Sequence, residues 1–152
     1  MRGTGSGARR WSAVDEGVPA GARVLVEGRG RGRPILLDEP LSPLGDIDVR
    51  RGVLRRTGEE LRGSLLMFPH PAGSSVGSYV LYALASRGAA PAAVLVRRAD
   101  LMLISGCALG GIPLVELRGE YERVRGLLSG CGVAEFSAEL RGGFRIACGG
   151  SP

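Results

Sequence analysis

The chain has 152 residues, a length typical of one domain, and its 44% hydrophobic residues suffice for a core that needs no disulfide staples. Only 5% of the residues are aromatic, so that core must be built mainly from Val, Leu, Ile and Ala. All 20 basic residues are arginines, and the net charge of +5 favours an anionic partner, whether a nucleic acid, an acidic metabolite or an acidic subunit. The absence of Asn and Gln is typical of a protein kept at high temperature, and a GC-rich genome would favour the same composition.

The sequence predicts neither membrane insertion nor export. Its longest apolar runs, such as residues 89–96, are far shorter than the roughly 18 residues needed to span a bilayer. Residues 1–10 are rich in Gly and Arg and lack the apolar stretch of a secretory signal. We therefore expect a cytoplasmic protein.

The first third of the chain is predicted to contain an arm, two strands and a long irregular region. Residues 1–21, rich in Gly, Ser and Arg, are expected to form a flexible arm before a folded domain over 22–152. Strand-like runs at 22–27 and 34–37 are joined by a glycine-rich stretch, 28–32, that indicates a turn. Prolines and turn formers predict a loop over 38–48, and the charged stretch 50–63 is expected at the surface.

The rest of the chain alternates between strand and helix patterns. A short apolar run predicts a buried strand over 64–68, which the Pro-His-Pro sequence at 69–71 ends. Apolar residues at helical spacing predict a helix over 75–86, closed by Arg87 and Gly88. The remaining predictions are a strand at 92–96, a short helix at 100–108, a strand at 113–116, a helix at 120–128, and a hairpin of 133–140 with 144–147 over the turn 141–143. This order predicts a mixed α/β domain.

The three cysteines, Cys107, Cys131 and Cys148, do not form a recognisable metal motif. They are 24 and 17 residues apart, without the short spacings of iron–sulfur cluster loops. An odd number of cysteines in a chain without a signal sequence argues against a disulfide framework. We therefore expect all three to be small buried apolar residues, and no metal ligand is assigned to the chain.

The segment 73–78, with the sequence GSSVGS, is the candidate site. It lies between a predicted buried strand and a helix, where unpaired N–H groups attract carboxylates or phosphates. Gly73 permits a sharp turn, and Ser74 is placed to cap the helix, which is the usual role of a serine there. The segment is not a P-loop, because it lacks a Lys and the P-loop glycine spacing. A serine-hydrolase triad is not indicated either, because His70 is the only histidine and lies between two prolines.

The sequence resembles the swivelling domain of the aconitase X family. The similarity rests on Asp38-Glu39-Pro40-Leu41-Ser42 with Gly45 and Asp48, on GSSVGSYVLYAL from Gly73, on GAAPAA from Gly88, and on IPLV from Ile112. It covers roughly residues 22–115, and Val76-Gly77-Ser78-Tyr79 is similar to the archaeal phosphomevalonate dehydratase branch. The resemblance implies a swivelling β/β/α fold, in which a mixed, barrel-like sheet is flanked by helices.

The same resemblance implies a function. The chain would be the small subunit of a hydro-lyase that dehydrates (R)-5-phosphomevalonate to trans-anhydromevalonate 5-phosphate in isoprenoid biosynthesis. Ser74 would accept the proton, while Gly73 and Ser75 would hold substrate oxygens. Ser42 would line the same pocket or serve only as a turn former. A large subunit would supply the iron–sulfur cluster, whose iron draws away the hydroxyl as a Lewis acid.

Two features bear on this hypothesis. Aconitases proper have an Arg after the two serines, where this chain has Val76, so the substrate carboxylate must be bound elsewhere. Asp38 and Glu39 are adjacent and point in opposite directions in extended chain, so they are not expected to act as a pair. The alternatives are an aconitase X-type dehydratase of hydroxyproline or another small hydroxy acid, and a basic nucleic-acid-binding module. The last lacks stacking aromatics, with only Trp11 in the arm.

Overall fold

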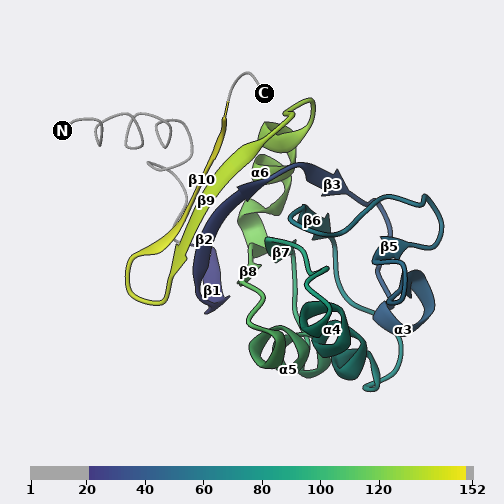
Figure 1. Ribbon diagram of the computed structural model, residues 1–152. Helices are drawn as coiled ribbons and strands as arrows, with labels where there is room; N and C mark the ends of the chain where they lie inside the picture. The colour runs from purple at the N-terminus through teal and green to yellow at the C-terminus, as the bar shows by residue number, and fades with distance from the viewer. Residues whose placement is uncertain (1–20, 150–152) are drawn as a thin grey trace.

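The computed structural model describes residues 21–149, which form a five-stranded sheet with structure packed on both faces (Figure 1). Its strands, in spatial order, are β1 (Arg23–Val26), β8 (Leu114–Glu116), β7 (Ala93–Val96), β6 (Leu65–Phe68) and β3 (Pro34–Leu36). Strands β8, β7, β6 and β3 are mutually parallel, and β1 pairs antiparallel with β8 at one edge. Every residue of β6 and β7 is buried, as expected for strands covered on both faces.

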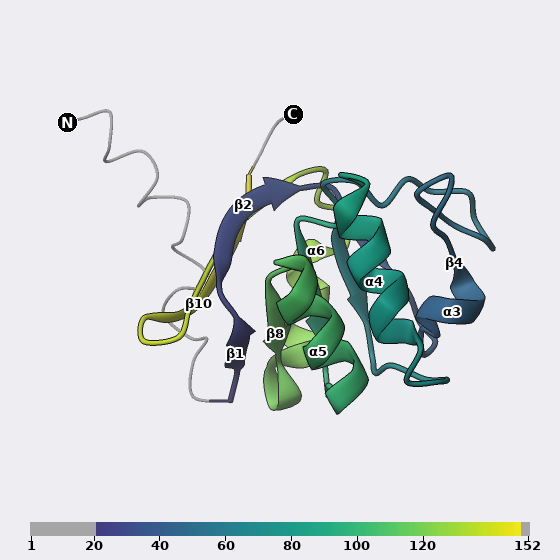
Figure 2. The ribbon, with the colours of Figure 1, turned by 60° about the horizontal axis from the view of Figure 1, so that its bottom comes forward.

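Helices α4 (Gly77–Ser86) and α5 (Leu101–Gly110) lie side by side on one face of this sheet (Figure 2). Their contact is close, because a Cβ atom at Gly106 would lie 2.7 Å from Leu81 Cδ1. Leu81, Leu84 and Leu103 fill one aliphatic core between these helices and the sheet. The short helix α3 (Pro43–Asp46) packs beside α4.

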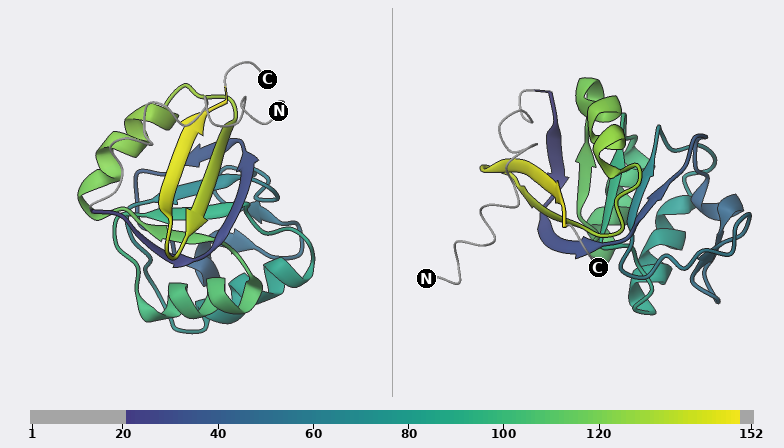
Figure 3. Two further views of the ribbon diagram at one scale, coloured as in Figure 1. Left: turned by 90° about the vertical axis from the view of Figure 1, so that its left-hand side faces the viewer. Right: turned by 90° about the horizontal axis from the view of Figure 1, so that it is seen from above.

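A second core fills the opposite face (Figure 3). There α6 (Tyr121–Leu128), preceded by the 3-10 turn η1 (Arg118–Glu120), lies near a three-stranded antiparallel sheet. This sheet has the order β10 (Gly143–Cys148), β9 (Ala134–Glu139), β2 (Gly28–Gly32). Strand β6 contributes to both cores, because alternate residues point to opposite faces: Leu66 and Phe68 to the first, Leu65 and Met67 to the second.

The predicted elements agree with this architecture, and the mixed α/β class is confirmed. All the strands and helices expected after residue 63 are present, with bounds that differ by at most two residues from the predicted ones. The predicted hairpin is β9–β10, and its register pairs Gly143 with Glu139. Residues 1–20, which include almost all of the predicted arm, lie outside the described residues. No helix within 21–149 is long and apolar enough to cross a membrane.

The prediction of a turn at residues 28–32 is wrong. This segment is β2, which pairs antiparallel with β9. Two of its glycines are required for close approach: a Cβ at Gly28 would lie 2.3 Å from Pro113 Cγ, and one at Gly32 would lie 2.1 Å from the Gly63 oxygen. A Cβ at Gly30 would lie 3.4 Å from the ring of Phe136. Glycine indicates close backbone approach in a strand as readily as it indicates a turn.

Two other expectations for the first third need correction. The predicted loop at residues 38–48 contains α3 and the strand β4 (Ile47–Asp48), which pairs with β5 (Val53–Leu54). The charged stretch 50–63 is not wholly at the surface, because Val53, Leu54 and Leu61 are buried. Single apolar residues among charges carry too little periodicity to reveal such short buried elements.

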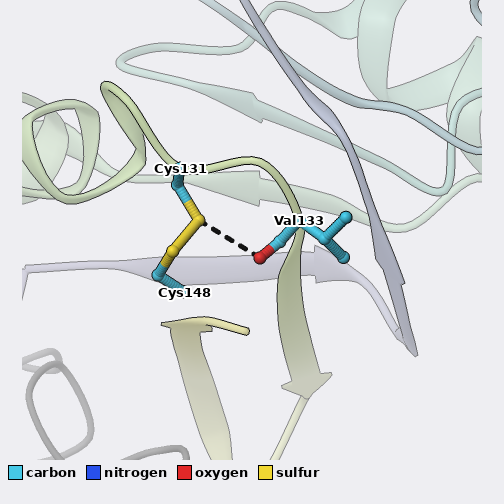
Figure 4. The surroundings of a disulfide bond; sticks show 3 residues. All are labelled: Cys131, Val133 and Cys148. Carbon is cyan, nitrogen blue, oxygen red and sulfur yellow. Dashed lines mark hydrogen bonds between the residues drawn. A yellow bond between two sulfur atoms is a disulfide. The ribbon is translucent and has the colours of Figure 1, made fainter. Parts of the chain in front are cut away.

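The expectation that all three cysteines would be free is also wrong. Cys131 and Cys148 form a disulfide, with Cα atoms 5.8 Å apart, beside the carbonyl oxygen of Val133 (Figure 4). The register of the hairpin pairs Cys148 with Ala134 and so brings it beside Cys131, which the cysteine count alone does not indicate. Cys107 is free and buried as predicted, and burial raises the pKa of its thiol to about 12.

Candidate functional site

The candidate site lies at the carboxyl edge of the parallel strands. After β6 the chain leaves the core at Phe68, passes the exposed His70 and turns at Gly73 into the approach to α4. The loop that carries Ser42 runs alongside this segment. The Leu41 N–H donates to the His70 oxygen at 3.2 Å, and the Ala72 N–H donates to the Leu41 oxygen at 2.9 Å. Two loops that are distant in sequence therefore meet at this edge, where open α/β sheets commonly bind ligands.

Gly73 and Ser42 are in direct contact. Gly73 has φ +92°, a conformation that disfavours residues with a side chain. A Cβ at Gly73 would lie 2.5 Å from Ser42 Oγ, so the turn also requires glycine for space. The Ser42 hydroxyl caps α3 by accepting the Gly45 N–H at 3.3 Å. The backbone N–H of Ser42 donates to the Asp46 carboxylate at 2.7 Å. Ser42 thus has the turn-forming role.

Ser74 and Ser75 are exposed at the head of α4. Ser74 Oγ accepts the Val76 N–H at 3.1 Å, and the Ser74 carbonyl accepts the Gly77 N–H. Because α4 begins at Gly77 with Val76 as its N-cap, Ser74 caps the turn before the helix and is not the helix N-cap that the sequence predicted. The Ser75 carbonyl accepts the hydroxyl of Ser78 at 3.1 Å. The hydroxyl hydrogen and a second lone pair of Ser74 remain for a ligand. Among residues 21–149, no arginine or histidine side chain hydrogen-bonds to Ser74.

Among the residues that the structure describes, the side chains of Asp38, Glu39 and His70 make no hydrogen bond to the serines. Val76 is 47% exposed, so the position after the serines presents an apolar side chain. Asp38 pairs with Arg125, and Glu39 pairs with Arg56 at 2.8 Å, so the two adjacent carboxylates have different partners. His70 is exposed, and its Nδ1 is 3.1 Å from the Pro71 oxygen. The structure brings Ser42, Gly73, Ser74 and Ser75 together. Asp38, Glu39 and His70 do not join them as a cluster, because the two carboxylates pair with separate arginines.

Sequence reasoning missed a charged cluster that follows β7 and β8 at the same edge. The Glu116 carboxylate is buried and accepts the Ala99 N–H at 2.9 Å and Arg118 Nε–H at 3.0 Å. Arg97 lies 4.5 Å from the centre of the Tyr121 ring and pairs with Glu122. Glu116 therefore connects the loop before α5 with Arg118 at the start of η1. The available signal was Arg97 directly after β7 and Glu116 as the last residue of β8.

The described residues do not fit an iron–sulfur cluster. No group of three or more His, Cys, Asp or Glu side chains within 21–149 is arranged to hold a metal ion. Two of the three cysteines are bonded to each other, and Cys107 is buried in the first core with its thiol protonated at neutral pH. The turn before α4 instead offers the exposed hydroxyl groups of Ser74 and Ser75, whose oxygens can bind a ligand or exchange a proton.

Comparisons with known proteins identify the family and agree with the fold. Residues 20–133 match the model of the aconitase X swivel domain family. The phosphomevalonate dehydratase small subunit of Pyrococcus furiosus is 40% identical over 98 residues, which cover 61% of this chain and 73% of that protein. The corresponding subunit of Aeropyrum pernix is 42% identical over 106 residues, 68% of this chain and 79% of that protein. The crystal structure of Thermococcus kodakaraensis aconitase X in its holo-form superposes with a TM-score of 0.69 at 29% identity, covering 83% of this chain and 94% of that one.

Proposed function

The chain belongs to the aconitase X swivel domain family, as its resemblance predicted, and from this premise we propose that it is the small subunit of a phosphomevalonate dehydratase. The reaction is the dehydration of (R)-5-phosphomevalonate to trans-anhydromevalonate 5-phosphate in an archaeal-type mevalonate pathway. The names and coverage of the Pyrococcus and Aeropyrum subunits support this substrate over hydroxyproline or another small hydroxy acid. The observation that carries the proposal is the glycine–serine turn at the head of α4, held against Ser42.

Ser74 is the proposed proton acceptor. The proton leaves the carbon between the carboxylate and the hydroxyl-bearing carbon. Its electron pair forms the new double bond as the hydroxyl leaves the neighbouring carbon as hydroxide, and the proton passes to the Ser74 alkoxide, which becomes a neutral hydroxyl. A base must lie within hydrogen-bond reach of that proton, and the exposed Ser74 hydroxyl is open to a substrate bound at the turn. A serine oxygen is a weak base until it is activated, so this role needs support from its surroundings.

Part of that support comes from the head of α4. Backbone N–H groups there favour negative charge, and the Val76 N–H already donates to Ser74 Oγ. The remaining positive charge is assigned to the larger subunit, since no cation within 21–149 bonds to Ser74. Gly73 and Ser75 bind substrate oxygens in this proposal, and Ser42 borders the pocket while it fixes the turn. The substrate carboxylate is assigned to the larger subunit or the helix N-terminus, because Val76 cannot bind it.

The proposed enzyme is complete only as a heteromer. The relatives are named small subunits, which supports a larger partner, and the active site would lie between the two. The iron–sulfur cluster is assigned to that partner, because the described residues of this chain do not fit one. Every step given to this chain uses its own hydroxyl and backbone groups.

The test is dehydration of 5-phosphomevalonate by the two subunits, co-expressed without oxygen. Ser74→Ala should lower kcat by about a thousandfold, within the range of general-base removal, with subunit assembly and cluster absorbance unchanged. Ser86→Ala, at the exposed far end of α4, is the matched control and should keep wild-type turnover. Near-full activity in Ser74→Ala would overturn the role of Ser74. A wild-type pair that binds a cluster but ignores this substrate would overturn the substrate and favour the hydroxy-acid alternatives.

A further inference from the structure

Three helices converge beside the serine turn at one crowded point. A Cβ at Gly77 would lie 3.3 Å from Pro43 and 3.0 Å from Met102 Sδ, so the first turns of α4, α3 and α5 meet there. Four large apolar side chains next to this point are exposed to solvent. They are Leu44 (49% exposed), Val76 (47%), Tyr79 (70%) and Leu101 (77%), and together we call them the apolar rim.

The rim is one local group because each member neighbours the convergence point. Leu44 follows Pro43, Val76 precedes Gly77, and Leu101 precedes Met102. Tyr79 lies one helical turn after Val76 on the same side of α4, and its N–H donates to the Val76 oxygen. Two other exposed leucines lie away from this point, Leu109 near the end of α5 and Leu140 after β9, each 63% exposed. Single exposed apolar residues are ordinary, whereas a group around a functional site indicates an interaction surface.

We infer that the apolar rim is the surface on which the larger subunit docks, and that docking closes the serine turn off from water. This inference rests on the proposed function, which supplies both the larger subunit and the role of Ser74 as proton acceptor. Ser74 is exposed in this chain, and no cation among the described residues bonds to it. The partner must therefore both cover the turn and supply the charge. Exclusion of water strengthens the attraction between that charge and a developing alkoxide. Tyrosine and aliphatic side chains are suited to such an interface, with the polar turn enclosed within it.

The test measures the affinity of this chain for the larger subunit without substrate. The variant Tyr79→Glu/Leu101→Glu places two charges on the rim, and the matched control Leu109→Glu/Leu140→Glu places two charges on equally exposed leucines elsewhere. Burying unpaired carboxylates in an interface is costly, so the rim variant should raise Kd by about a hundredfold or more. The control should stay within about threefold of wild type. Circular dichroism and thermal unfolding should show both variants folded, because all four side chains are exposed.

Each outcome decides the inference. Equal affinity of the rim variant and wild type would overturn it, as would an equal loss in the control, which would indicate a general charge effect. A wild-type chain that binds no larger subunit would overturn it as well. A milder variant, Tyr79→Ala/Leu101→Ala, removes apolar surface without adding charge and should raise Kd by about tenfold. Tight rim-dependent binding in a pair that ignores 5-phosphomevalonate would support the docking surface while contradicting the proposed substrate.

Discussion

The two faces of the five-stranded sheet are covered by different elements, and only one of them carries the candidate site. On the α4–α5 face, two helices direct their N-terminal ends, with the serines and the apolar rim, toward the carboxyl edge of the strands. On the opposite face, a hairpin, a disulfide and α6 enclose the second core. Both cores are equally well buried, yet only the first holds the elements that carry the candidate site. The comparison indicates that the second face mainly stabilises the domain, while the first positions its chemistry.

Replacing one buried leucine on each face should distinguish an effect on stability alone from an effect on both stability and turnover. Leu84 in α4 and Leu128 in α6 are 0% and 1% exposed, and each fills its own core. Replacement by Ala should lower the free energy of unfolding by about 2–5 kcal/mol in both cases. Only Leu84→Ala should also lower turnover, because α4 carries the serine turn.

The measurement combines denaturant unfolding of each variant with the dehydration assay well below its melting temperature. Wild-type turnover in the Leu128→Ala enzyme is the internal control for stability loss alone. Equal losses of turnover in the two variants would contradict the division between the faces, since both helices would then influence the site.

The sequence predicted the elements after residue 63 on both faces, and it missed β2, α3, β4 and β5 earlier in the chain. Buried strands such as β6 and β7 and the amphipathic α4 have strong local patterns, so their positions followed from periodicity. The Gly-Ser-Ser turn was found because it combines a strand end, a glycine and a helix start. The contact of Gly73 with Ser42 could not be predicted from local pattern, because it depends on two loops that meet only in the fold. Strand β2 and the disulfide were missed for the same reason, since both depend on pairing with distant β9 and β10.

Removal of the disulfide should affect the second face alone. Cys131 and Cys148 are 17 residues apart, and closing a loop of that length stabilises a fold by about 3 kcal/mol through the entropy of the unfolded chain. The Cys131→Ser/Cys148→Ser variant should lose about that much free energy of unfolding. Its turnover should be unchanged at temperatures where it remains folded, because the bridge lies on the face away from the serine turn.

Thermal unfolding of wild type with and without a reductant provides the parallel measurement. The reduced wild type and the double serine variant should melt at the same temperature, below the oxidised protein. If all three melt together, the bridge contributes nothing and the stabilising role assigned to this face is wrong.

The smallest expected change in stability concerns two glycines with similar backbone conformations, whose replacement should have different effects on turnover. Gly73 and Gly58 have φ of +92° and +76°, so Ala at either position should lower the free energy of unfolding by about 1 kcal/mol. Their surroundings differ, because a Cβ at Gly58 would meet nothing within 4 Å, whereas one at Gly73 would press on Ser42 Oγ. Gly73→Ala should therefore shift the serine turn and lower turnover by about a hundredfold, as small misplacements of catalytic groups do. Gly58→Ala should keep full activity, and equal turnover in the two variants would show that the contact between Gly73 and Ser42 does not position Ser74.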